Sequence, residues 1–149
     1  MTNTFRIRPK SDYLQKASWK DLFLLAEHWQ SDMDFFRDEL RFLHRLVDKY
    51  FILLIKEEHL SQTQSIVIEI ENLSKKVDQI NENIVIHLDH LEAIIGKSSM
   101  YDKQKFRDEH EQLEEKLVVF TKHFWKVKKD VFGIMENMLR EDKLQHLIA

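Results

Sequence analysis

Apolar side chains recur along this chain at alternating spacings of four and three residues, in three long stretches that we call the seams. The first seam contains Leu22, Ala26, Trp29, Met33, Phe36, Leu40, Leu43, Val47, Tyr50 and Leu54. The second seam contains Ile66, Ile70, Leu73, Val77, Ile80, Ile84, His87, Leu91 and Ile94. The third seam contains Phe106, His110, Leu113, Leu117, Phe120, Phe124, Val127, Val131, Ile134 and Met138. Because this spacing keeps one stripe of a helix facing a partner helix, the pattern predicts three long helices with coiled-coil-like packing.

Capping residues and a glycine suggest where the first two helices begin and end. The first predicted helix starts at Ser18, whose hydroxyl can accept a backbone N–H of the first turn, and its seam continues to Leu54. The second covers about 63–95, with a cap at Ser61 and a left-handed stop at Gly96.

The third predicted helix runs from about residue 100 to residue 140 or beyond, after a cap at Ser99. Gly133 interrupts it, and we expect a bulky neighbouring side chain to explain that glycine. Short connections make successive helices antiparallel, so the predicted fold is an all-α, up-down-up bundle of three long helices. Residues 1–17 read as an N-terminal arm, and residues 18–149 as a single helical-bundle domain.

Composition narrows the class of protein. The chain has 23 basic and 26 acidic side chains without a long basic stripe, which argues against binding nucleic acid. It has no cysteine, no Gly-rich phosphate loop and no nucleophile motif, so we expect no enzyme activity. The segment 1–9 lacks an apolar leader, and the longest apolar run, 50–55, is too short to span a bilayer. We therefore expect a cytoplasmic protein.

The first and third predicted helices carry a second apolar stripe beside their seams. On this basis the predicted interface residues are Phe35, Phe42, Leu46, Leu53, Val118, Trp125, Phe132 and Leu139. Counting residues from the turns sets Leu46 level with Trp125 and Leu53 level with Phe132. Glu39 falls within the first of these stripes, where we expect it half-buried beside an Arg or Lys.

A patch of this size on a monomer usually marks an interface. Either the chain ends, including Phe5 and Leu147, fold back over the stripes, or two copies pack them together. We favour a homodimer, because aromatic and Met side chains are enriched in interface cores. The predicted function is a non-enzymatic structural or protein-interaction bundle that associates with itself or with another helical protein.

Two histidines interrupt the seams, and they give the alternative function. His87 and His110 are equally distant from the turn near residues 98–99, so an antiparallel hairpin brings them into one layer. That layer can be a polar core layer that fixes helix register. Alternatively it can hold a transition metal such as Zn or Fe, with no other cofactor expected. The candidate metal ligands are His87, His110, His90, Glu114, Asp32 and Asp34.

The segment 29–43, WQSDMDFFRDELRFL, and the run Asp108-Glu109-His110 resemble a group of uncharacterised small bacterial helical-bundle proteins. The resemblance implies an α-helical fold and carries no known activity. His110 and Glu114 also match the HxxxE spacing of hemerythrin-like bundles. The chain lacks the HxxxH helix of that family and the paired ExxH of ferritin-like di-iron proteins.

Overall fold

The computed structural model describes residues 17–54, 59–96 and 103–148. These ranges contain the helices α2 (Trp19–Lys49), α3 (Phe51–Leu54), α4 (Leu60–Ile95) and α5 (Lys103–Ile148), and no strand. The all-α prediction is therefore confirmed. No helix in the described part of the chain is both long and apolar enough to cross a membrane. The predicted arm, apart from Ala17, and the predicted cap at Ser99 lie outside the described residues.

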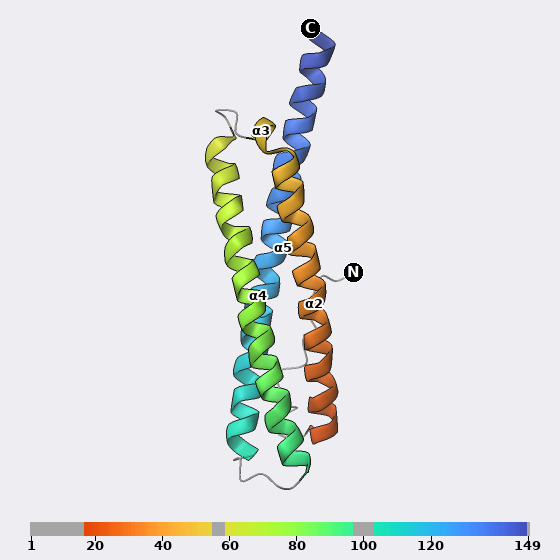
Figure 1. Cartoon of the computed structure of the whole chain (residues 1–149), viewed down its shortest axis with the longest axis vertical. Helices are drawn as coiled ribbons and strands as arrows, with labels where there is room; N and C mark the ends of the chain where they lie inside the picture. The colour runs from red at the N-terminus through yellow and green to blue at the C-terminus, as the bar shows by residue number, and fades with distance from the viewer. Residues whose placement is uncertain (1–16, 55–58, 97–102, 149) are drawn as a thin grey trace.

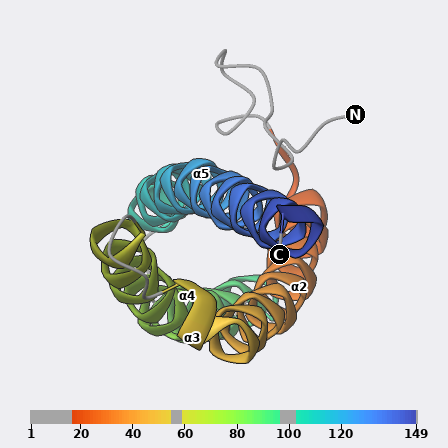
Figure 2. The same cartoon turned by 90° about the horizontal axis from the view of Figure 1, so that it is seen from above.

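The three long helices lie side by side in an elongated bundle (Figure 1). Helix α4 packs closely on both α2 and α5, whereas the backbones of α2 and α5 approach each other at few positions. Seen from above, the three helices surround a common axis (Figure 2). The C-terminal part of α5 extends past the ends of the other helices (Figure 1).

The core consists of the three seams, as predicted. Every seam residue is buried except Tyr50, which is half-buried. At one end of the bundle the start of α2, the end of α4 and the start of α5 meet, and Leu22, Leu91 and Phe106 pack together there with Ala17. This packing follows from helix geometry, because a residue every three to four positions returns to the same face.

The ends of the first helix are partly as predicted. The hydroxyl of Ser18 accepts a hydrogen bond from the backbone N–H of Asp21, 3.1 Å away, which confirms the N-cap. The helix does not run unbroken to Leu54, however. It ends at Lys49, and the separate turn α3 follows after Tyr50, whose carbonyl accepts both the Leu53 and the Leu54 N–H groups.

The predicted start of the second helix is wrong by three residues. Helix α4 begins at Leu60, and Ser61 lies inside it rather than capping it. The residue before the helix is His59, which is buried and whose Nε2 lies 3.0 Å from the Glu141 Oε2 of α5. The Thr63 hydroxyl donates to the Leu54 carbonyl. Contacts with residues of α5 and α3 therefore determine where α4 begins.

Both glycine predictions need correction. Gly96 does end α4, but it has φ −70° and ψ −4°, which is right-handed rather than left-handed backbone. At Gly133, apart from the adjacent residues and the nearby backbone of its own helix, no heavy atom lies within 4 Å of the position that a Cβ would take. Crowding by a bulky neighbour therefore does not explain this glycine.

The predicted alignment of α2 with α5 is also wrong. The Phe36 ring lies 5.4 Å from the Phe120 ring and 4.8 Å from the Phe124 ring, measured between centroids. These contacts set residue 36 of α2 level with about residue 122 of α5. Leu46 therefore lies further toward the C-terminal end of α5 than Trp125, rather than level with it. The difference is about one heptad. It arises because the predicted alignment of α2 with α5 depends on the lengths of two connections, α2 to α4 and α4 to α5, whose shapes the sequence does not give.

Candidate functional site

The two seam histidines meet in the core, on facing positions of α4 and α5. The Nε2 atom of His87 lies 2.8 Å from the Nδ1 atom of His110, which is hydrogen-bond distance. His87 is 3% exposed and His110 is fully buried. One N–H···N hydrogen bond between the two imidazoles therefore joins α4 to α5 inside the apolar core.

Aromatic rings cover the histidine pair. The Phe106 ring stacks on His87 with a centroid distance of 4.2 Å and an interplanar angle of 7°. The Trp29 ring of α2 lies 4.5 Å from the His110 ring. All three long helices thus contribute a ring to one layer. We define the histidine layer as His87, His110, Trp29 and Phe106.

Burial in this layer changes the acid–base behaviour of His87. Desolvation lowers the pKa of His87 from 6.5 to about 4. The Glu109 carboxylate acts in the opposite direction, and His90 lowers the pKa further. At neutral pH His87 is consequently uncharged, as a buried imidazole hydrogen-bonded to another imidazole should be.

The candidate metal ligands do not form one site within the described ranges. His90 lies on the side of α4, with its Nδ1 3.6 Å from the Glu109 carboxylate, and Asp34 is bound to Arg37 at 3.3 Å. Asp32 and Glu114 are half-buried. Within the described ranges, no three His, Asp or Glu side chains are placed to hold one metal ion.

A pocket of about 220 Å³ reaches the histidine layer from the surface between α4 and α5. His87, His90 and Glu109 line it together with Asn83, Ile86, Gln112, Leu113 and Lys116. Ile86 and Leu113 are the apolar members of this lining, and the other side chains are polar or charged. The pocket gives water a route toward one edge of the buried pair.

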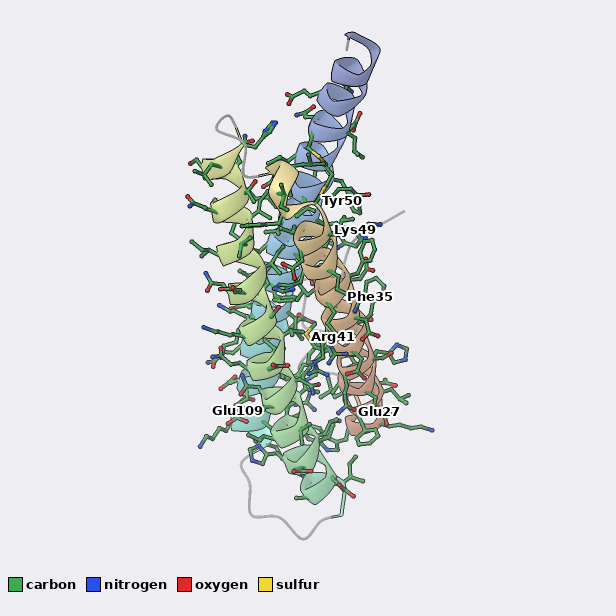
Figure 3. The ribbon with its side chains drawn as sticks, turned by 45° about the horizontal axis from the view of Figure 1, so that its top comes forward. Glu27, Phe35, Arg41, Lys49, Tyr50 and Glu109 are labelled. Atoms are coloured by element: carbon green, nitrogen blue, oxygen red, sulfur yellow. The ribbon has the colours of Figure 1, made fainter. Side chains whose placement is uncertain are left out.

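A second candidate site is an apolar surface where α2 and α5 lie side by side. We define the α2–α5 face by the side chains Phe35, Glu39, Phe42, Leu46, Trp125, Lys128, Phe132 and Leu139. Four of its apolar members are exposed, at 50% for Phe35, 41% for Phe42, 42% for Phe132 and 47% for Leu139. Phe35 projects from α2 on the side away from α4 (Figure 3). The predicted interface residues Leu53 and Val118 are half-buried.

Ring contacts tie this face to the core. Phe35 lies 5.5 Å from Phe36, Phe36 lies 4.8 Å from Phe124, and Phe124 lies 5.3 Å from Trp125. The rings therefore form a continuous line from the surface of α2, through the core, to the surface of α5. Phe35 and Trp125, at the two ends of this line, each contact a buried ring.

One charged pair lies among these rings. The Lys128 ammonium contacts the Glu39 carboxylate, and the two side chains are only 23% and 25% exposed. The same ammonium lies 5.0 Å from the centre of the Trp125 ring and 5.9 Å from that of Phe132. The expectation that Glu39 is half-buried beside a basic residue is confirmed.

Sequence reasoning missed two contributors to these sites. It left out Lys128, although Lys128 falls in the heptad spacing between Trp125 and Phe132. It also left out Glu109, which lies one residue from His110 and faces His90 across the helix pair. The heptad position was the signal for Lys128, whereas Glu109 had no signal in the sequence.

Comparisons with models of protein families, with curated proteins and with solved structures gave no match for this chain.

Proposed function

We propose that this chain is a non-enzymatic helical bundle that binds protein chains, and in particular a second copy of itself, through the α2–α5 face. The associating unit is the up-down-up bundle of α2, α4 and α5, acting as a structural module in the cytoplasm. The observation that carries the proposal is the second heptad stripe, in which exposed Phe35, Phe42 and Phe132 surround a half-buried charged pair.

A second copy is the occupant that this surface fits. A two-fold interface uses the same patch on both subunits, so the patch must be complementary to itself. The α2–α5 face meets this condition because α2 supplies an acidic residue and α5 supplies a basic residue at one level. Its aromatic side chains are the type that anchors interfaces.

Light scattering of the full chain between about 1 and 100 µM tests this proposal. We expect a dimer mass that falls to the monomer mass in the double variant Phe42→Asp/Phe132→Asp. Ile68→Asp is the matched control, because Ile68 is 57% exposed on α4 and lies outside the face. Circular dichroism checks that the variants keep their helices.

Two results would refute the proposal. One is a wild-type chain that stays monomeric over the whole concentration range. The other is a dimer that survives the double variant or dissociates in the Ile68→Asp control, since the interface would then lie elsewhere.

A further inference from the structure

The charged pair at the centre of the α2–α5 face determines how a second copy can sit on it, an inference that rests on the proposed self-association. Glu39 and Lys128 are three-quarters buried within one chain, at heptad positions where the neighbouring stripe residues are Phe35, Phe42, Trp125 and Phe132. A partner that covers this face removes the remaining water. Complementary charges from that partner then stabilise the complex, because an ion pair taken out of water needs further hydrogen bonds to replace those that water made.

Two symmetric arrangements bring the faces together. Helices α2 and α5 begin at the same end of the bundle (Figure 1). A two-fold axis parallel to the helices places α2 of one copy over α5 of the other, with both bundles pointing the same way. An axis across the helices places α2 over α2, with the bundles pointing in opposite directions.

The charged pair distinguishes these arrangements. With the parallel axis, Glu39 lies opposite Lys128 of the second copy and Lys128 lies opposite its Glu39, so four charges alternate in sign. With the crossing axis at the level of the pair, Glu39 faces Glu39 and Lys128 faces Lys128. With a crossing axis about half a helical turn above or below the pair, Glu39 faces an apolar stripe residue of the second copy, such as Phe42 or Phe35. Like charges that face each other repel, so the crossing axis at the level of the pair is unfavourable.

We propose that two copies associate as a parallel dimer in which Glu39 and Lys128 of each chain pair with Lys128 and Glu39 of the other. The apolar rings supply the contact area, and the four charges select the orientation. Both protruding ends of α5 then lie at the same end of the dimer.

Charge reversal tests the pairing. We expect Glu39→Lys and Lys128→Glu each to raise the dimer dissociation constant at least tenfold, because each homodimer brings four like charges together. An equimolar mixture of the two variants, and the double variant Glu39→Lys/Lys128→Glu, should dimerise within a few-fold of wild type. Lys122→Glu, an exposed position on the same helix, is the control with the same change in charge. Circular dichroism shows whether every variant folds.

A distance measurement tests the orientation. The chain has no cysteine, so Lys20→Cys gives one spin label per copy at the lower end of α2. The parallel dimer predicts labels about 20–30 Å apart, two to three helix diameters. An antiparallel dimer centred on Glu39 separates them by more than about 55 Å, twice the length of 19 helical residues.

The outcomes separate this inference from the proposed function. Suppose that the dimer dissociates in Phe42→Asp/Phe132→Asp, but its dissociation constant is unchanged in the charge variants or the labels give the long distance. Either result overturns the parallel pairing and remains consistent with the proposed function. A wild-type monomer overturns both. Loss of dimer in each single reversal, recovery in the mixture and the short distance together support the parallel pairing.

Discussion

Burial of His87, which is hydrogen-bonded to His110, makes the bundle sensitive to acid, and this sensitivity can be removed by mutation. Folding lowers the pKa of His87 from 6.5 to about 4 through burial. Above pH 6.5 the ring is neutral in both states, so it contributes no pH dependence. As the pH falls below 6.5, the unfolded chain takes up a proton on His87 that the folded chain accepts only near pH 4. Stability is therefore lost on acidification through this window.

The expected size of the loss follows from the same numbers. Each pH unit in the window costs about 1.4 kcal/mol, so the interval from 6.5 to about 4 costs about 3 kcal/mol. Domains of this kind have a total stability of about 5–15 kcal/mol, which makes the loss easy to measure. Buried Trp29 and Phe106 cover the pair, so water reaches it only at the edge that faces the pocket between α4 and α5.

The perturbation is the double variant His87→Leu/His110→Leu, compared with wild type by urea unfolding at pH 7.5, 6, 5 and 4, with helicity as the signal. At pH 7.5 we expect the variant to be as stable as wild type or more stable, because well-packed apolar residues often replace buried polar pairs without loss. Its advantage should grow by about 3 kcal/mol by pH 4. His44→Gln is the control, because it removes a histidine that is exposed on α2.

The single variants complete the cycle. His87→Leu alone leaves His110 without its imidazole partner, which should cost about 1–3 kcal/mol at pH 7.5 relative to the double variant. Parallel stability curves for wild type and the double variant between pH 6.5 and 4 would refute the reasoning. So would a large loss of helicity in the double variant, because the layer would then do more than join two helices.

Two further predictions concern the helices themselves, and urea unfolding at neutral pH checks both. Gly133→Ala should raise the free energy of unfolding by about 0.5–1 kcal/mol, because this helical glycine has open space where a Cβ would lie; an unchanged or lower stability would show that the glycine has a role in packing. Ser18→Ala should lower the free energy of unfolding by about 1 kcal/mol, because the N-cap hydrogen bond from the Asp21 N–H is lost. Ser18→Asp keeps an acceptor and should be nearly as stable as wild type. Equal stability of all three chains would contradict this account.

The core could be predicted from the sequence because helix geometry alone determines it. Residues that recur every three to four positions share one face, and every seam residue except Tyr50 is buried. The meeting of His87 and His110 was predictable for the same reason, since a hairpin with a short turn pairs residues at equal distances from that turn. Glu39 was predictable from its place in a second stripe.

The helix ends were harder because distant residues determine them. Helix α4 starts three residues before the predicted position, where buried His59 contacts Glu141 of α5, 82 residues later in the chain. No capping rule that reads neighbouring residues can include that contact. Gly96 shows the same limit, because a glycine permits left-handed backbone without requiring it.

The error of about one heptad between α2 and α5 has a more general cause. A heptad seam is periodic, so sliding one helix by seven residues again places apolar side chains on apolar side chains. Apolar matching therefore leaves several alignments nearly equal, and the polar contacts must decide among them. Each pair of helices has at least one: Arg37 binds Asp78 at 3.0 Å between α2 and α4, His87 binds His110 between α4 and α5, and Glu39 binds Lys128 between α2 and α5. A slide of one heptad would keep most of the apolar burial and break the polar pair. The polar contacts between helices thus select one alignment of the bundle. Of the three pairs, Glu39–Lys128 is the one that lies on the α2–α5 face. By the same physical argument, this pair selects the orientation of a second copy.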